Sequence, residues 1–310
     1  MPRSLVVLVG ATGVGKTALA VEAARDCPVP VEAISLDSRQ IYRGMDKGTG
    51  KPTAQERAAL PHHLLDLVDP DQRFDAGRYR RAVEQVLPGL WERGVTPLVV
   101  GGAGFYLRAL QEGFFELPDE PERLEAIRRE LSALDLEALR ARLGEVDPER
   151  AAQLHPHDRY RHERALEIHA LSGRSMTELS RDFVPSTVLD CELRIFHLQL
   201  PRWQLHGRIA RRAGRWLDEG WIEETRALLD AGWAPDSPGL SILGYREIVA
   251  HLREELPLRE LEERILISTR RYARQQEIWF RKVEAQRRGT PEDPRLRRAL
   301  VEALRGAAPS

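Results

Sequence analysis

The sequence predicts an α/β protein in which helices flank a parallel sheet and an all-helical domain is inserted into the chain. Three observations lead to this prediction. Short apolar runs alternate with helical patterns over the first 112 residues, an order typical of right-handed crossover connections. A glycine-rich loop directly follows the first apolar run. Strand signals then disappear between residues 118 and about 186, where helical patterns dominate.

The core elements follow from the hydrophobic period. Continuous apolar runs at 5–9, 31–36 and 97–100 are expected of buried parallel strands. Helical patterns cover 18–25, 76–92 and, briefly, 105–110. Residues 1–112 should therefore form the first part of the α/β core.

The helical insertion is predicted for residues 113–189, with helices that prolines separate: 122–134, 136–143, 148–154 and 158–171. An apolar run at 193–200 should rejoin the sheet. Helices then follow at 203–217, 221–231, 245–252 and 258 to about 288. Residues 190–290 thus complete the core, and 291–310 are expected to form a loosely held C-terminal tail.

Composition excludes several classes of protein. The 310 residues carry 47 basic and 48 acidic side chains, so no global charge points to nucleic acid. Two local stretches are basic: 202–216 has five arginines and no acid, and 264–288 has eight basic and two acidic residues. Each is either a solvated face or a polyanion-binding surface. No run of 18 apolar residues occurs, so no membrane span is predicted.

Cysteine and lysine are both scarce. Cys27 and Cys191 alone cannot form a disulfide framework or a cysteine-rich zinc site, and they are typical of a cytoplasmic protein. Because 43 of the 47 basic residues are arginine, a retained lysine marks a position where arginine fails. The four lysines are Lys16, Lys47, Lys51 and Lys282.

The glycine-rich loop matches the P-loop pattern G-x-x-x-x-G-K-[ST] between a strand and a helix. Its backbone N–H groups and the helix N-terminus can bind phosphate oxygens, the lysine can reach the terminal oxygens, and the threonine hydroxyl can bind Mg²⁺. The alternative is that these glycines form an accidental turn. Because the loop lies between a strand and a helix, we predict a P-loop NTPase-like parallel sheet. The loop consists of Gly10, Ala11, Thr12, Gly13, Val14, Gly15, Lys16 and Thr17.

Other parts of an NTPase are missing from the sequence. No Asn-Lys-x-Asp guanine-reading motif occurs, and the strand at 98–100 ends in glycines, not in a Mg²⁺-binding Asp. A GTPase or motor ATPase is poorly supported. A small-molecule kinase remains, as does an enzyme whose substrate carries a diphosphate.

Asp37 directly follows the second predicted strand, at the sheet edge where ligands bind. We expect it beside the phosphate loop. There its carboxylate could bind Mg²⁺ or act as a general base, or it could cap the following turn. Position alone leaves these alternatives open.

The run DSRQIYRGMDKGTGKP at 37–52 resembles the DSxQxYRGMDIGTAKP signature of tRNA dimethylallyltransferases, also called tRNA isopentenyltransferases. The phosphate loop GATGVGKT resembles the corresponding loop of that family. Shorter matches follow in family order: HHLLD at 62–66, GGAGFY at 101–106, RALE at 164–167 and GYRE at 244–247. Together they span residues 5 to about 280.

This resemblance implies transfer of a dimethylallyl group from dimethylallyl diphosphate to the N6 amine of the adenosine at tRNA position 37, beside the anticodon. Asp37 would then accept the amine proton, while Lys16 and Thr17 with Mg²⁺ stabilise the leaving diphosphate. Arg208 and Arg212, one turn apart, resemble family arginines near the diphosphate, or they lie on a solvated face. Ala103 stands where the family usually has Thr, which puts a hydroxyl role at that position in doubt.

An adenine in the anticodon loop must be flipped out to reach such a site. The resemblance implies that the insertion clamps the anticodon stem-loop. Tyr160 and Tyr245 are either stacking platforms or ordinary half-buried aromatics. The tRNA contacts that the resemblance implies are Asp37, Ser38, Arg39, Gln40, Ala103, Tyr160, Arg161, His162, Glu163, Arg164, Ser241, Ile242, Leu243, Gly244, Tyr245 and Arg246.

Of these, Tyr160 to Arg164 belong to the insertion. The one expected cofactor is Mg²⁺. The expected partners are tRNA and dimethylallyl diphosphate, with a monomeric, cytoplasmic enzyme and no membrane. Three alternatives remain: a P-loop small-molecule kinase, a prenyltransferase acting on free adenylate, and a non-enzymatic RNA-binding module. The insertion and the basic stretches favour a macromolecular acceptor over free adenylate, and the P-loop with Asp37 disfavours a mere binder.

Overall fold

The computed structural model describes residues 3–115, 117–118 and 120–309. The chain divides into two compact units. One comprises Met1–Gly113 and Ser186–Ser310, and the other comprises Phe114–Pro185. The second unit is slightly shorter than the expected insertion of 113–189.

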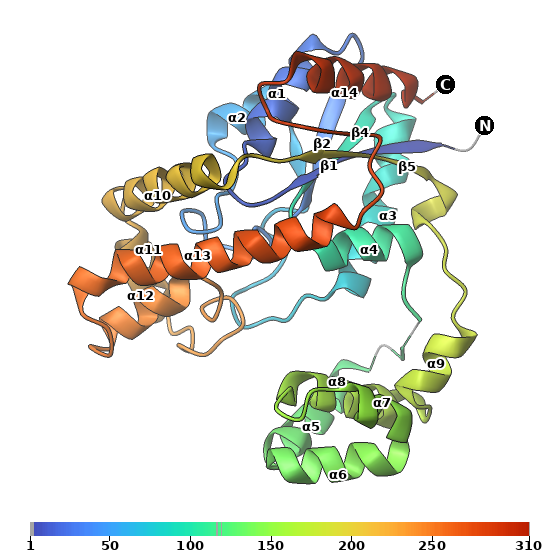
Figure 1. The fold of residues 1–310 in the computed structure, drawn as a ribbon, viewed down its shortest axis with the longest axis vertical. Coiled ribbons are helices and arrows are strands. Elements are labelled where there is room, and N and C mark those ends of the chain that lie inside the picture. The colour runs from blue at the N-terminus through green and yellow to red at the C-terminus, as the bar shows by residue number, and fades with distance from the viewer. Residues whose placement is uncertain (1–2, 116, 119, 310) are drawn as a thin grey trace. The chain divides into compact units, whose positions relative to one another are not determined.

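The first unit contains a six-stranded sheet in which every neighbouring pair is parallel (Figure 1). This confirms the predicted α/β fold class. The order is β3-β2-β4-β1-β5-β6, so β4 lies between β1 and β2. The strands are β1 (Ser4–Gly10), β2 (Val31–Leu36), β3 (His62–His63), β4 (Thr96–Gly101), β5 (Glu192–Leu198) and β6 (Arg287–Gly289).

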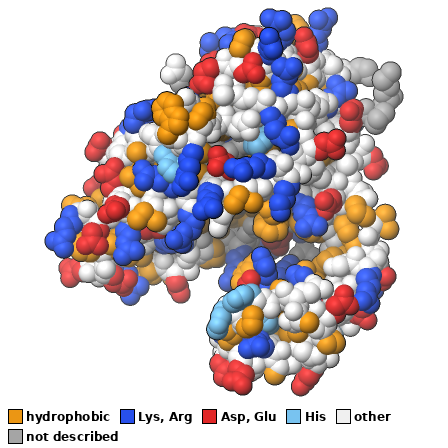
Figure 2. Space-filling model, viewed as in Figure 1, with side chains coloured by type: hydrophobic (Ala, Val, Ile, Leu, Met, Phe, Trp, Pro, Cys, Tyr) orange, Lys and Arg blue, Asp and Glu red, His pale blue; other side chains and the backbone are white. Residues whose placement is uncertain are grey.

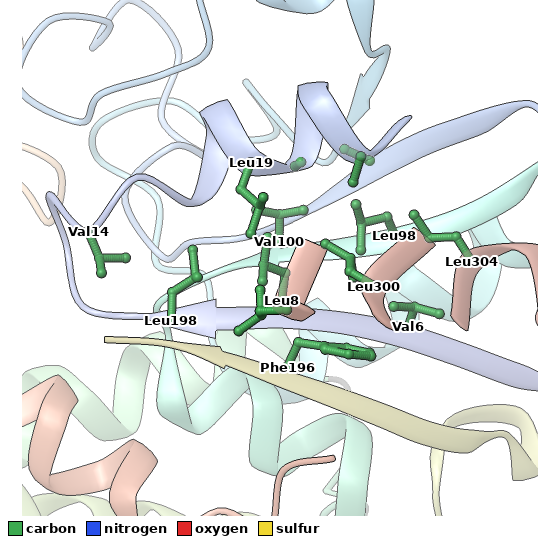
Figure 3. Packing of buried hydrophobic residues seen from close by; sticks show 14 of the residues in the cluster. Val6, Leu8, Val14, Leu19, Leu98, Val100, Phe196, Leu198, Leu300 and Leu304 are labelled. Carbon is green, nitrogen blue, oxygen red and sulfur yellow. The ribbon is translucent and has the colours of Figure 1, made fainter. Parts of the chain in front are cut away.

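Side chains of β1 alternate between two buried layers. Val6 and Leu8 pack against α1 (Lys16–Asp26) and α14 (Pro294–Gly306), and Figure 3 shows both residues among Leu98, Val100, Phe196, Leu198, Leu300 and Leu304. Leu5, Val7 and Val9 enter the opposite layer with α3 (Ala76–Glu92) and α4 (Gly104–Glu112). Helices therefore cover both faces, as parallel sheets require.

Helix α14 corrects the expectation of a loosely held tail at 291–310. Leu296, Leu300 and Leu304 recur on one face of the helix and are fully buried in the core. Each such leucine contributes about 1.5–3 kcal/mol relative to an exposed one. Asp293 accepts a hydrogen bond from the Arg295 N–H at the start of the helix. The C-terminal segment is thus part of the core.

Helix α13 (Leu258–Arg281) ends earlier than the expected residue 288. The chain turns after this helix because Val283 and Ala285 pack into the buried layer that contains α3 and α4. The Gln286 N–H then donates to the Ile195 carbonyl (2.8 Å), and residues 287–289 form the edge strand β6. Further elements that the sequence does not predict include β3 and α2 (Ala54–Ala59), which begins with a capping box.

A helical layer follows β5 in the chain. It consists of α10 (Arg202–Asp218), α11 (Trp221–Asp230), α12 (Tyr245–Leu252) and α13. Ile41, Tyr42 and Met45, from the segment after β2, are buried among its apolar side chains. This packing fixes the segment that contains Asp37 against the helices.

The second unit is all-helical over its described residues, as predicted. Buried Leu131, Leu139, Leu143, Leu154 and Leu166 form its own small core. Among the described residues, no helix of either unit is long and apolar enough to cross a membrane. The helices are α5 (Pro121–Ser132), α6 (Leu136–Val146), α7 (Pro148–Gln153), α8 (Arg159–Ser172) and α9 (Met176–Asp182), and a 3₁₀ turn at Val188–Asp190 follows in the first unit.

Candidate active site

The phosphate loop connects β1 to α1. Gly13 and Gly15 have φ values of 82° and 106°, in the left-handed region where residues with a side chain are strained. A Cβ at Gly15 would also approach the Arg208 Nη1 to 3.1 Å. The sequence therefore needs glycine here for both conformation and space.

The Lys16 ammonium folds over this loop and donates to the carbonyls of Gly10 (2.9 Å) and Ala11 (3.0 Å). Burial lowers the pKa of Lys16 to about 8, although the nearby Asp37 carboxylate opposes the shift and Arg212 adds to it. A buried cation with two weak acceptors is well suited to an anionic ligand.

Asp37 lies at the carboxyl end of β2, as predicted. It is not on a strand adjacent to the phosphate loop, because β4 intervenes. Its Oδ1 accepts the Arg39 N–H (2.9 Å), which stabilises the turn after β2. Among the described residues, only Oδ1 is engaged in this way. Asp37 thus caps a turn and still lines the cavity described next.

A cavity of about 570 Å³ opens between the phosphate loop and the segment after β2. Such a volume is typical of small-ligand sites. Lys16, Thr17 and Asp37 share this cavity. Figure 2 shows Lys and Arg side chains gathered over α10 and α13 on the face drawn. The basic residues of α10 that line the cavity are Arg208, Arg211, Arg212 and Arg215.

Arg208 and Arg212 project from α10 onto the phosphate loop, not onto a solvated face. Arg208 donates to the Val14 carbonyl (3.0 Å) and to Glu292 (2.5 Å). Arg212 donates to the Thr12 hydroxyl (2.7 Å), and its guanidinium lies 4.5 Å from the centre of the Trp216 ring. Burial lowers the pKa of Arg212 to about 10, and the positive charge of Arg39 adds to this shift. Two cations are therefore held beside the loop.

Sequence reasoning missed the contribution of α13. The buried Gln276 accepts the Thr12 N–H (2.8 Å) and donates to the Gly102 carbonyl (2.8 Å), so it joins the phosphate loop to the turn after β4. Tyr272 lies under the Arg39 guanidinium, 3.9 Å from the ring centre. The sequence signal is the spacing of Gln276, which falls on the same face of α13 as the buried Ile265 and Ala273.

Two residues expected to contact tRNA in the core are engaged internally. Gln40 donates to the Gly50 carbonyl (2.9 Å) and accepts from Ser35 (2.8 Å). Tyr245 is 0% exposed, donates to Glu224 (2.5 Å) and accepts the Gly48 N–H (3.2 Å). Of the two alternatives for Tyr245, this burial favours an ordinary aromatic of the core over a platform that stacks on a base.

The neighbours of Tyr245 differ in exposure. Gly244 is buried, and a Cβ there would lie 2.2 Å from the Trp221 ring. Ser241 and Arg246 are exposed, and Arg246 pairs with Glu247 (3.0 Å). Ile242 and Leu243 are partly buried, and Ser38 and Arg39 are partly buried in the turn after β2.

In the second unit, the expected tRNA contacts share the first turns of α8. Tyr160 is 68% exposed and the Arg161 side chain 62%, whereas His162 is buried and its Nδ1 lies 2.8 Å from the Asp158 carbonyl. The His162 ring is therefore engaged within its own helix, and a contact between this residue and tRNA stays a prediction. Glu163 pairs with Arg159 (2.7 Å) and Arg164 with Glu167 (2.9 Å).

Ala103 begins α4 at its N-cap position and has no side chain to cap the helix. Its N–H donates to the Leu36 carbonyl (3.0 Å), and the residue is buried. The backbone N–H is therefore already used within the fold. It cannot also replace the hydroxyl that a threonine would provide.

Comparisons with known proteins agree with this geometry. The family model described as IPP transferase matches residues 40–283, and a model described as isopentenyl transferase matches residues 3–67. The tRNA dimethylallyltransferase of Syntrophobacter fumaroxidans is 43% identical over 278 residues, 89% of this chain and 80% of that protein. The enzyme of the same name from Anaeromyxobacter sp. (strain K) is 44% identical over 280 residues, covering 90% of each.

Solved structures agree as well. A tRNA isopentenylpyrophosphate transferase from Bacillus halodurans is 31% identical with a TM-score of 0.68, covering 98% of both chains. A eukaryotic dimethylallyltransferase acting on tRNA has a TM-score of 0.76 at 26% identity, over 90% of this chain and 70% of that one. The extent of the family-model match and these identities show that the chain belongs to the tRNA dimethylallyltransferase family.

Proposed function

We propose that this protein transfers a dimethylallyl group from dimethylallyl diphosphate to the N6 amine of the adenosine at tRNA position 37, with release of diphosphate. One observation carries the proposal beyond family membership. A carboxylate, Asp37, and a phosphate-binding lysine, Lys16, line the same cavity. The site therefore combines a proton acceptor with an anion cradle, and β4 ends in Gly101, not in the acidic residue of an ATPase.

In this mechanism the phosphate loop binds the diphosphate of the donor. The bond between the allylic carbon and the diphosphate oxygen breaks, and negative charge grows on the leaving group. Lys16, Arg208 and Arg212 are placed to stabilise that charge, because all three hydrogen-bond to the loop itself. Since these cations are already oriented, little reorganisation is needed during the reaction.

The amine of adenine is a weak nucleophile, so its proton must leave as the new carbon–nitrogen bond forms. Asp37 is the acidic residue placed for this step. One of its oxygens stabilises the turn through the Arg39 N–H, and the other is available to accept the proton.

Mg²⁺ fits this site as a partner of the diphosphate. Among the described residues, no group of three or more His, Cys, Asp or Glu side chains could hold a metal alone. Mg²⁺ commonly takes most of its ligands from substrate phosphates and water, with one or two protein oxygens. Thr17 lines the cavity and would supply one such oxygen through its hydroxyl. When bound, the ion would neutralise charge on the diphosphate.

The acceptor adenosine must leave the anticodon loop to reach Asp37. Tyr160 and Arg161 on α8 have the exposure needed to bind RNA, by stacking and by phosphate contact. In the core, Arg39 on Tyr272 and the exposed Arg246 are further candidates. We propose the second unit as the clamp on the anticodon stem-loop.

We further propose that the protein acts as a monomer, in the cytoplasm where tRNA is found. The assay offers radiolabelled dimethylallyl diphosphate and Mg²⁺ with tRNA, AMP or no acceptor, and [γ-³²P]ATP in parallel. Label on tRNA alone supports the proposal. Label on AMP would indicate an adenylate prenyltransferase, and phosphate transfer from ATP would indicate a kinase.

A further inference from the structure

Lys51 is a buried lysine outside the phosphate site. Only 1% of its side chain is exposed. The ammonium has three donors and three acceptors: the Tyr42 carbonyl (2.7 Å), the Asp46 carboxylate (2.7 Å) and the Asp66 carboxylate. The charge is therefore fully satisfied without a ligand, and Lys51 does not line the cavity.

These three contacts hold the segment 37–51 in a closed loop. Tyr42 and Asp46 lie within the segment 37–51, and Asp66 lies beyond β3. Asp66 has a φ of 54° and donates its N–H to the Gln40 carbonyl (3.1 Å). Lys51 thus ties the end of the segment to its middle and to a second stretch of chain.

The same closure reaches Asp37 through Gln40. The Gln40 side chain donates to Gly50, the neighbour of Lys51, and accepts from Ser35 on β2. Only two residues lie between Gln40 and Asp37 in the chain. Without the ammonium, the chain at Gly50 and Lys51 would no longer be held to Tyr42, Asp46 and Asp66. The hydrogen bond from Gln40 to Gly50 would then hold the turn of Asp37 less firmly.

Lysine is the residue that this arrangement needs. Three acceptors converge on a single nitrogen, which suits a compact ammonium and not a planar guanidinium. The chain uses arginine at 43 of its 47 basic positions, yet it keeps lysine here. The scarcity that marks Lys16 in the phosphate loop therefore marks Lys51 as well.

We propose that Lys51 is a positioning residue for prenyl transfer, which holds the turn of Asp37 in place without touching either substrate. This inference rests on the proposed function and extends it. Displacement of a reacting group by about 1 Å can cost about a hundredfold in rate. Loss of Lys51 should therefore lower the rate of the chemical step and leave the affinity for dimethylallyl diphosphate unchanged.

The test measures single-turnover prenyl transfer at saturating tRNA for Lys51→Met, Lys51→Arg and the matched control Lys47→Met. Lys47 lies in the same loop, and its ammonium forms no ion pair with a described residue. We expect a fall of about 10- to 100-fold for Lys51→Met and incomplete rescue by Lys51→Arg. The control should keep the wild-type rate, and the dissociation constant of dimethylallyl diphosphate should stay within about twofold throughout, because Lys51 does not contact the phosphate loop.

A double-mutant cycle with Asp37→Ala separates positioning from general loss of structure. If Lys51 acts through Asp37, Lys51→Met should change the rate by less than about twofold in the Asp37→Ala background. An equal fall in both backgrounds, a wild-type rate for Lys51→Met, or full rescue by Lys51→Arg would each overturn the proposal.

If Lys51→Met does not fold, Asp66→Asn provides the milder perturbation, because the ammonium keeps Tyr42 and Asp46. It should lower the rate in the same direction by a smaller factor, and a wild-type rate would refute the role. Failure of the wild-type protein to prenylate tRNA is a separate result. It would refute the proposed function and not the role of Lys51 alone.

Discussion

The affinity for dimethylallyl diphosphate should fall as the pH rises from about 7 to about 9, because Lys16 loses its proton in this range. Burial lowers the pKa of its ammonium to about 8, and the diphosphate requires the charged form. About nine tenths of the unbound protein then carries the charge at pH 7 and about one tenth at pH 9. The association constant should therefore fall about tenfold between these two pH values.

Linkage fixes the sign of two accompanying effects. Between about pH 8 and 10.5 the unfolded chain binds more protons at this lysine than the folded protein, so the Lys16 contribution to stability rises with pH in that window. Diphosphate binding restores the ammonium. Calorimetry in buffers of different ionisation enthalpy should thus detect an uptake of about 0.9 proton at pH 9 and about 0.1 at pH 7.

Equilibrium binding of labelled dimethylallyl diphosphate at three pH values provides the assay. Lys16→Met should bind more weakly, and its affinity should not change with pH. A flat pH dependence in the wild-type protein would refute the reasoning. The same tenfold fall in Lys16→Met would assign the titration to another group.

Four further substitutions test other parts of the protein. Asp37→Ala should lower the single-turnover rate by about 10²–10⁴ with tRNA affinity nearly intact, and a wild-type rate would exclude Asp37 as the base. Arg161→Ala should reduce the slope of log affinity against log salt for an anticodon stem-loop by about 0.7–0.9. Arg164→Ala should change that slope less and destabilise its unit more, because Arg164 pairs with the buried Glu167; an unchanged slope in both variants would shift the clamp to the basic α13. Ala103→Ser should stabilise the protein by about 0.5–2 kcal/mol in denaturant unfolding, because α4 has no side-chain cap, and no gain would show that the buried N-cap cannot be satisfied this way.

Long elements with strong periodicity could be predicted from the sequence. The apolar runs of β1, β2 and β4 and the amphipathic α3 lie where the hydrophobic pattern places them. The two-residue strand β3 is too short to have a pattern. Helix α14 was underestimated because its leucines gain their stability from burial against the sheet, which no local signal reports.

The residues of the candidate site also divide into those that the sequence identifies and those that only the fold shows. The phosphate loop is a contiguous motif with its own physics, so its eight residues could be identified from spacing. Tyr245 and Gln276 depend on which face of a helix is buried and on partners more than 20 residues away. The sequence therefore leaves Tyr245 as either a stacking platform or an ordinary aromatic, whereas in the fold its hydroxyl donates to Glu224. The role of Gln276 is not identified from the sequence.

The nucleotide that becomes prenylated tests the central claim most directly. Unmodified tRNA with adenosine at position 37 is incubated with the protein, Mg²⁺ and labelled dimethylallyl diphosphate, beside the same tRNA with guanosine at that position. The account predicts label only in the first tRNA, recovered after digestion as N6-dimethylallyladenosine. Equal labelling of both tRNAs, or label recovered on any other nucleotide, would contradict it.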